Sequence, residues 1–180
     1  MDKTSSPTWL EQVEIRPARK LDLPDMEWEG EFAHFRRLYA QTFLNMRNGI
    51  SLMWVARLPE NELIGQMFIQ LASSRVELAD GNRRAYIYGF RIKPAYRNQG
   101  LGTRMMKHAE NDLFQRGYRS VTLNVSRSNP DARRLYERLG YRVVADEPGR
   151  WSYVDQHGQR QHVHEPSWRM EKSLSGMKKA

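Results

Sequence analysis

Two glycines separated by one residue, Gly100 and Gly102, mark the part of the sequence where binding chemistry is most readily predicted. Glycine lets backbone N–H groups approach a ligand closely, and a helix starting at Leu101 would direct its unpaired N–H groups and positive end to the same place. A phosphate or pyrophosphate suits such a turn. The cations that we expect around this ligand are Lys93, Arg97, Arg104, Arg127 and Arg133.

The glycine pattern is weak by itself, because a tight turn from a strand into a helix uses the same residues. Two common nucleotide motifs are not present. There is no G-x-x-x-x-G-K-[ST], and Met105 stands where G-x-G-x-x-G requires its third glycine. The phosphate hypothesis therefore needs support from other parts of the chain.

The chain contains no cysteine. This excludes disulfide scaffolds, thiolate zinc sites and cysteine nucleophiles. His162 and His164 would share one face of a strand, and His157 lies nearby. No carboxylate cluster accompanies them, so we expect an exposed polar hairpin here and no metal site.

Composition predicts one hydrophilic domain with a basic surface. The chain has 180 residues, 39% of them hydrophobic, and a mean hydropathy of −0.78. At roughly 100–200 residues per domain, this length predicts a single domain over 1–180, with a core at about 11–173 and polar tails at both ends. The net charge of +8 predicts an anionic partner, which is a nucleic acid, a membrane surface or a phosphorylated small molecule.

We expect a cytoplasmic location and no membrane partner. Residues 1–7 are polar and lack the apolar segment of a secretory signal. No stretch of the sequence approaches the roughly 18 consecutive apolar residues that a transmembrane helix needs.

The first half of the chain predicts strands around one helix. Apolar residues at helical spacing predict the helix from about Glu31 to Arg47, and Gly89 predicts a bulge within a central strand. The predicted strands are residues 13–16, 52–56, 63–69 and 85–92, of which 52–56 and 63–69 form an antiparallel hairpin.

The second half predicts strands that alternate with helices. One helix is predicted from Leu101 to Gly117, and Asn129 caps a second, with proline and an acid following it. Two final strands are expected to pair as a hairpin insert at about 149–166. The predicted strands are residues 121–125, 141–144, 151–154 and 161–170. Both halves together predict an α/β protein with a mixed (α+β) sheet and a strand–helix–strand–helix–strand second half.

Two segments carry motifs in a familiar order. Residues 92–102 (IKPAYRNQGLG) follow [QR]-x-x-G-x-[GA] after a strand ending in V/I-x-P, and residues 129–141 follow N-x-x-A-x-x-x-Y-x-x-x-G-[FY]. They resemble motifs A and B of the GNAT superfamily of N-acetyltransferases, and the resemblance covers most of residues 13–173. It implies a largely antiparallel sheet with splayed central strands, flanked by helices.

The resemblance implies acetyl-CoA, or another acyl-CoA, as the acyl donor. The pyrophosphate would sit on the glycine turn, and the pantetheine arm would lie along the end of the central strand, where a backbone N–H would polarise the thioester carbonyl. The residues assigned to the cofactor by the resemblance are Phe90, Arg91, Ile92, Arg97, Asn98, Gln99, Gly100, Leu101, Gly102, Thr103, Asn124, Asn129, Arg133 and Tyr136.

Tyr136 matches the tyrosine that protonates the departing CoA thiolate in this family. A phenol with a pKa of about 10 is protonated at neutral pH and can donate to a thiolate. Periodicity alone predicts a core tyrosine, and both roles are compatible. Without cysteine, no acetyl-cysteine intermediate can form, which favours direct attack by the amine in a ternary complex.

The acceptor side is less defined by the sequence. Many relatives carry a carboxylate early in the central strand, where this chain has Tyr86, so the base is a water chain, a residue between Asp22 and His34, or absent. The acidic segment around Trp28 predicts either a cationic amine acceptor or only a solvated helix start. The acceptor-site candidates are Asp25, Glu27, Trp28, Glu29 and Tyr86.

The leading hypothesis is an enzyme that transfers an acetyl group from acetyl-CoA to a primary amine on a small molecule or peptide. Two other classes remain. One is a catalytically silent sensor that binds acyl-CoA with the same fold. The other is a nucleic-acid-binding domain, which would need arginines gathered on one face beside aromatic residues. Trp and Tyr residues in the C-terminal hairpin are candidates for a homodimer contact.

Overall fold

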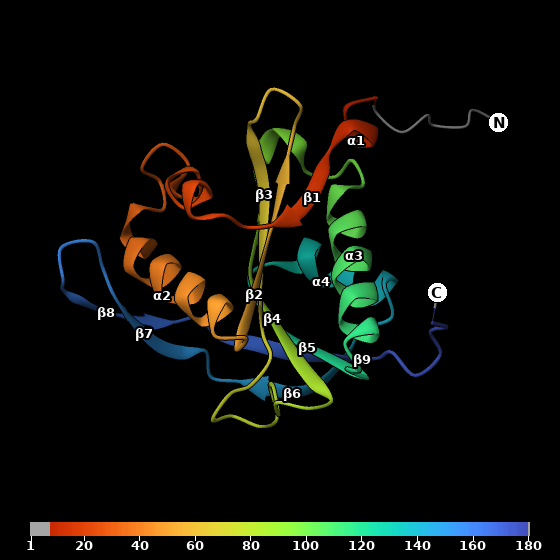
Figure 1. Cartoon of the computed structure of the whole chain (residues 1–180). Helices are drawn as coiled ribbons and strands as arrows, with labels where there is room; N and C mark the ends of the chain where they lie inside the picture. Colours follow the sequence, from red (N-terminus) through yellow and green to blue (C-terminus); the bar gives the residue numbers. More distant parts are fainter. Residues whose placement is uncertain (1–7, 180) are drawn as a thin grey trace.

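The computed structural model describes residues 8–179 and shows a central sheet with helices on both sides (Figure 1). Residues 1–7, on which the prediction about a secretory signal rests, lie outside the described residues. The helices are α1 (Thr8–Gln12), α2 (Arg36–Arg47), α3 (Leu101–Gln115) and α4 (Pro130–Arg138), and the 3₁₀ helices are η1 (Lys20–Asp22), η2 (Pro24–Glu27), η3 (Ala33–Phe35) and η4 (Pro94–Tyr96). The strands are β1 (Glu14–Pro17), β2 (Ser51–Arg57), β3 (Leu63–Gln70), β4 (Arg84–Ile92), β5 (Ser120–Ser126), β6 (Arg142–Glu147), β7 (Arg150–Val154), β8 (Arg160–His164) and β9 (Ser167–Ser173).

The main sheet has seven strands in the order β1-β2-β3-β4-β5-β9-β6. Every neighbouring pair is antiparallel except β4 and β5, which are parallel because α3 connects them as a crossover. This confirms the predicted mixed sheet. The strands β7 and β8 form a separate antiparallel pair, which we call the β7–β8 ribbon.

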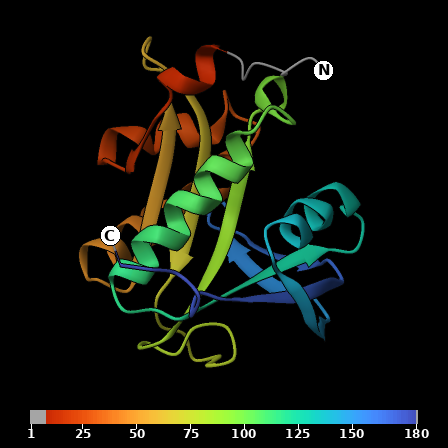
Figure 2. The same ribbon diagram turned by 90° about the vertical axis from the view of Figure 1, so that its right-hand side faces the viewer.

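The two central strands separate along their length. Pairing between β4 and β5 ends at Ile87 and Leu123. Beyond that point β4 continues to Ile92, while β5 stays paired with β9 as far as Ser126 and Ser167. Figure 2 shows the two strands diverging beside α3 and α4. The splayed central strands implied by the resemblance are therefore confirmed.

A bulge in β4 accompanies this separation. Gln66 pairs with Arg91 and Phe68 pairs with Tyr88, so two residues of β4 lie opposite the single residue between them in β3. Gly89 has φ +58°, and a Cβ there would lie 2.5 Å from the Phe68 ring. Only glycine fits this position, which confirms the predicted bulge.

Two apolar clusters lie on the opposite faces of the sheet. On one face α3 buries Leu101, Met105, Ala109 and Leu113, at a spacing of four residues, against the strands. On the other face α2 and the 3₁₀ helices cover a second cluster centred on Tyr39 and Phe68, both at most 2% exposed. Figure 1 shows α2 and α3 on opposite sides of the sheet.

Two sequence predictions need correction. The helix expected from about Glu31 begins as the 3₁₀ helix η3 and becomes α-helical only at Arg36. The strand expected over 161–170 is two strands, β8 and β9, which belong to different sheets. Pro166 lies in the break, and because proline has no N–H it cannot continue a ladder of hydrogen bonds. Helix α1 was not predicted.

A buried ion-pair network fixes the acidic segment before α2. Asp22 is 2% exposed and accepts hydrogen bonds from Arg16 at 2.7 Å, the Arg19 N–H at 2.6 Å and Arg57 at 2.6 Å. Burial alone would raise the pKa of Asp22, but these hydrogen bonds and the Arg57 charge lower it to about 2. Arg57 is itself only 4% exposed, and its pairs with Asp22 and with Asp25 at 2.7 Å offset the cost of burying its charge.

We predict that Asp22→Asn lowers the free energy of unfolding at pH 7 by about 3 kcal/mol, because it leaves the buried Arg57 charge with only the half-exposed Asp25 as a carboxylate partner. Since its folded-state pKa is depressed, Asp22 stabilises the wild type fully above the pKa of an unfolded aspartate, about 3.9. This contribution is lost as the pH falls through about 2. The variant should lack that part of the acid dependence in urea unfolding curves.

Asp146→Asn is the matched control for this measurement. Asp146 pairs with Arg127 at 2.8 Å, but its side chain is 73% exposed. We expect a change below about 1 kcal/mol. Equal losses for the two variants would contradict a structural role for the Asp22 network.

Candidate active site

The glycine turn has the geometry that an anion-binding turn requires. Asn98 has φ +59° and Gly100 has φ +100°, which turns the chain sharply between η4 and α3. Within residues 8–179, no hydrogen bond uses the backbone N–H groups of residues 98–103. The adjacent Arg97 is exposed, and its Nε donates to the Ile92 carbonyl at 2.7 Å. The turn therefore presents unpaired donors beside a cation.

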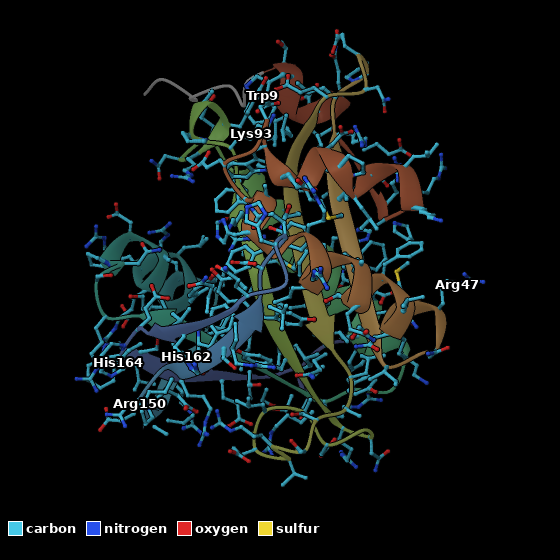
Figure 3. All side chains as sticks on the ribbon, turned by 90° about the vertical axis from the view of Figure 1, so that its left-hand side faces the viewer. Trp9, Arg47, Lys93, Arg150, His162 and His164 are labelled. Atoms are coloured by element: carbon cyan, nitrogen blue, oxygen red, sulfur yellow. The ribbon has the colours of Figure 1, made fainter. Side chains whose placement is uncertain are left out.

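Helix α1 supports the back of this turn. The Trp9 indole N–H donates to the Gln99 side chain at 3.3 Å, and its ring lies 5.1 Å from that of Tyr96. Arg104 donates to the carbonyl of Leu10 and, at 2.8 Å, to that of Val13. Figure 3 shows Trp9 and Lys93 at the same end of the molecule. This contact could not be predicted from the sequence, because α1 is short and far from the turn in sequence.

Most of the cations predicted around the phosphate have other partners. Arg104 holds α1, which corrects its expected role. Lys93 lies 3.4 Å from Glu29, and Arg133 lies 2.8 Å from Glu137. Arg127 pairs with Asp146 and lies over the Trp168 ring at 3.8 Å. Among these five cations, Arg97 and Arg104 have no carboxylate partner in the described part of the chain, and the Arg104 guanidinium is occupied by the carbonyls of Leu10 and Val13.

A polar atom without a hydrogen-bond partner lies where β4 and β5 separate. The side-chain oxygen of Asn124, on β5 just beyond the last pair with β4, is buried and has no hydrogen-bond partner among residues 8–179. A buried acceptor of this kind favours a ligand that donates to it. Asn129, also assigned to the cofactor, instead caps α4 by accepting from the Ala132 N–H at 3.2 Å.

Phe90 and Ile92 place the end of β4 against the turn. A Cβ on Gly102 would lie 3.5 Å from Ile92 and 3.2 Å from Leu135 of α4. This close approach brings the turn, β4 and α4 together, so the predicted cofactor residues 90–92 and 97–103 adjoin in space. Leu101 is buried beneath the turn, whereas Gly102 and Thr103 are half-buried at the start of α3.

Tyr136 lies on α4 and is buried, at 9% exposed. Burial raises the pKa of its phenol to about 12, and the neighbouring Tyr86 adds to this effect. Burial likewise raises the pKa of Tyr86 to about 12. No hydrogen bond within the described residues uses the Tyr136 hydroxyl. Tyr86, on β4, thus lies close enough to Tyr136 to raise its pKa, and both phenols are protonated at neutral pH.

The acidic residues predicted at the acceptor side are each paired with a cation. Asp25 lies 2.7 Å from Arg57, Glu27 lies 2.8 Å from Arg36, and Glu29 lies 3.4 Å from Lys93. These three carboxylates are therefore paired, whereas Glu31 in the same segment is exposed and pairs with no cation among residues 8–179. Trp28 is 5% exposed, and its indole N–H has no partner in the described part of the chain.

An aromatic wall lies on the α2 side of the sheet. It consists of four side chains that were not among the predicted site residues. Phe32 and Phe35 lie parallel with centroids 6.3 Å apart, and Tyr153 of the β7–β8 ribbon packs 4.8 Å from Phe35. Trp151 of the same ribbon stacks on Phe35 at 6.1 Å. The aromatic residues just before α2 could have indicated this wall in the sequence. Their spacing is, however, equally typical of the buried face of a helix.

The remaining predictions concern metal and membrane. His162 and His164 are exposed on β8, as expected, and residues 8–179 contain no group of three or more side chains placed to hold a metal ion. In the same part of the chain, no helix combines the length and apolar character needed to cross a membrane.

Sequence comparison identifies the class of protein that this fold and turn define. Residues 15–141 match the acetyltransferase (GNAT) family. The chain belongs to this family.

Named relatives match shorter segments of the chain. An uncharacterised N-acetyltransferase of Bacillus subtilis is 27% identical over 89 residues, 49% of this chain and 54% of the relative. An alanine N-acetyltransferase of Escherichia coli K12 that acts on a ribosomal protein is 37% identical over 57 residues, 32% of this chain and 38% of the relative. The matches thus span about half or less of the length of these relatives.

Solved structures share the fold across nearly the whole chain. The Escherichia coli ribosomal-protein alanine N-acetyltransferase has a TM-score of 0.68 and 20% identity, covering 92% of this chain and 96% of that chain. A spermidine N-acetyltransferase from Vibrio cholerae, in complex with CoA and spermine, has a TM-score of 0.67 and 18% identity, covering 92% and 97%.

We predict that Gly100→Ala weakens acetyl-CoA binding by at least about tenfold. The new Cβ would strain a residue at φ +100° and lie 3.2 Å from Leu10, so the turn must shift and its N–H groups lose their common direction. The dissociation constant from isothermal titration calorimetry measures this effect.

Gly117→Ala at the other end of α3 is the matched control. Gly117 has φ +99°, but a Cβ there would meet nothing within 4 Å. It should cost a similar conformational strain, seen as a lower Tm, while the acetyl-CoA dissociation constant stays within about twofold of the wild type. Similar weakening by both variants would show that general destabilisation, and not the turn, controls binding.

Proposed function

We propose that this chain transfers an acetyl group from acetyl-CoA to a primary amine by direct attack in a ternary complex. The observation that carries the proposal is that a turn with unpaired N–H groups lies beside the place where β4 and β5 separate. One binds a pyrophosphate and the other receives an extended arm. We take residues 1–180 as a single catalytic domain.

The residues present fit the cofactor. The N–H groups of residues 98–103, with Arg97, suit its phosphates, and the unpartnered Asn124 oxygen suits an amide N–H of its arm. Exposed backbone at residues 90–92 offers a strand edge beyond the last β4–β5 pair. When bound, acetyl-CoA supplies an acyl group activated as a thioester. The other assigned residues, Asn129 and Arg133, stay proposals as weaker polar contacts.

Tyr136 is proposed as the general acid. In the reaction a bond forms between the amine nitrogen and the acyl carbon while the carbon–sulfur bond breaks. The Tyr136 phenol, with its pKa raised to about 12, is protonated at physiological pH and can give its proton to the leaving sulfur. Solvent then restores the proton to Tyr136.

The amine must lose a proton before it attacks. Tyr86 is not a base at neutral pH, because burial raises its pKa to about 12. The carboxylates between residues 22 and 29 are held in ion pairs with arginine or lysine. We therefore propose that the proton leaves through water and that the enzyme acts on the fraction of amine that is already neutral. Rates should then rise with pH up to the pKa of the acceptor.

The fold neighbours support an amine acceptor without specifying one. One is named for spermidine and another for the alanine of a ribosomal protein. Their shared chemistry is a primary amine. An acyl-CoA-binding sensor of the same fold is the second candidate, since Tyr86 stands where many relatives have a carboxylate.

We predict that Tyr136→Phe lowers kcat by about 10²-fold and leaves the acetyl-CoA dissociation constant nearly unchanged, because only the proton donor is removed. Tyr118→Phe is the control. Tyr118 is also buried, at 8% exposed, but lies beyond the far end of α3. An unchanged kcat in Tyr136→Phe would remove Tyr136 as the acid.

The class of function is tested by titrating acetyl-CoA into the purified protein and then following thiol release with a panel of primary amines. We expect binding, and turnover with at least one amine. Binding without turnover on any amine would favour the sensor. Failure to bind acetyl-CoA would overturn the proposed function.

A further inference from the structure

We propose that the acceptor amine also carries a carboxylate, and that the Arg91 side chain binds this carboxylate beside an aromatic wall. The proposal rests on the proposed function and names the substrate class of the same site. It separates this chain from its fold neighbours named for spermidine, which is a polycation.

The position of Arg91 follows from the bulge in β4. Phe90 and Ile92, on either side of it, lie toward Gly102 and the glycine turn. Arg91 reaches the opposite face, where its guanidinium donates to the Tyr39 hydroxyl of α2 at 3.0 Å. The backbone of residues 90–92 is the proposed cofactor edge, so the Arg91 side chain projects from that edge to the α2 side. An acceptor that approaches from the α2 side therefore meets this cation.

The surroundings of Arg91 provide no counterion. Its guanidinium lies 4.3 Å from the centroid of the Phe32 ring and 5.0 Å from that of Phe35. Its side chain is half-buried, and in the described part of the chain no carboxylate lies within ion-pair distance of it. The two rings and the phenol orient the guanidinium but leave its charge uncompensated. A ligand carboxylate would accept two parallel hydrogen bonds from a guanidinium held in this way.

Most of the nearby acids already have a cationic partner and attract a cationic substrate weakly. Asp25, Glu27 and Glu29 each pair with an arginine or lysine, as described above. A polyamine would find only Glu31 of this segment unpaired among the described residues, would otherwise compete with these pairs, and would lie close to the Arg91 charge. Both effects disfavour it.

The aromatic wall adds a second element of recognition. Phe35 is in contact with Tyr153 and Trp151 of the β7–β8 ribbon, and Trp151 is 42% exposed. Rings at these positions favour an apolar or aromatic body attached to the amine. The combination of an oriented guanidinium and aromatic rings fits an α-amino acid with an aromatic side chain, or a compound of the same charge pattern.

The test compares four acceptors: L-phenylalanine, L-phenylalaninamide, phenethylamine and spermidine. The first three share the aromatic body and differ in the carboxylate. Rates are expressed per concentration of unprotonated amine, so that differences in amine basicity do not enter. We expect kcat/KM for L-phenylalanine to exceed that of the other three by at least about tenfold, which corresponds to 1.4 kcal/mol.

Arg91→Gln should reduce this selectivity ratio to about 1, and Arg91→Lys should retain part of it, because a point charge still attracts the carboxylate. Calorimetric binding of L-phenylalanine in the presence of CoA should weaken in the same order. Arg47→Gln is the matched control, since Arg47 is exposed at the end of α2 and away from the ribbon (Figure 3). It should leave the ratio unchanged.

Two outcomes would overturn the proposal while sparing the proposed function. One is faster turnover of spermidine or phenethylamine than of L-phenylalanine by the wild type. The other is a carboxylate preference that Arg91→Gln and Arg91→Lys do not alter. Failure of the wild type to bind acetyl-CoA would instead overturn the proposed function, and this inference with it.

Discussion

Hydrogen bonding between β4 and β5 ends after Ile87 and Leu123, and the arrangement of the candidate site depends on that point. Two parallel strands that begin as neighbours can part only if each has another way to satisfy its backbone. β5 remains bound to β9 along its whole length, while β4 remains bound to β3 through a bulge at Gly89. The bulge turns the end of β4 toward the glycine turn and exposes the backbone that we assign to the cofactor.

Features that depend on local chemistry were predictable from the sequence. The bulge requires a residue at φ +58° without a Cβ, and only Gly89 meets this need. Asn129 caps α4 through its own side chain, with Pro130 in the first turn, so the start of that helix is encoded within three residues. The turn at Gly100 has the same local character. These signals placed the central strand, both helices of the second half and the glycine turn.

Features that depend on contacts between distant segments were not predictable. Residues 161–170 have a strand-like composition apart from Pro166, and the assignment of β8 and β9 to different sheets is decided by their pairing with β7 and with β5, of which β5 is distant in sequence. The sequence showed Arg104 next to the turn but not that α1 would occupy its guanidinium. Likewise, the aromatic wall joins residues near position 35 to residues near position 152, which periodicity cannot relate.

Charge shows most clearly why composition is a poor guide to the acceptor. The acids from Asp22 to Glu29 make one segment of a basic chain negatively charged. Taken from the sequence alone, this segment suggests a site that attracts a cation. In the folded protein these acids form ion pairs with Arg57, Arg36 and Lys93. Near this segment, Arg91 has no opposite charge within ion-pair distance in the described part of the chain, although its sequence position alone assigned it to the cofactor strand. What an acceptor meets is decided by which ion pairs the fold completes, because the field of a paired charge falls off quickly while that of a half-buried, unpaired one does not.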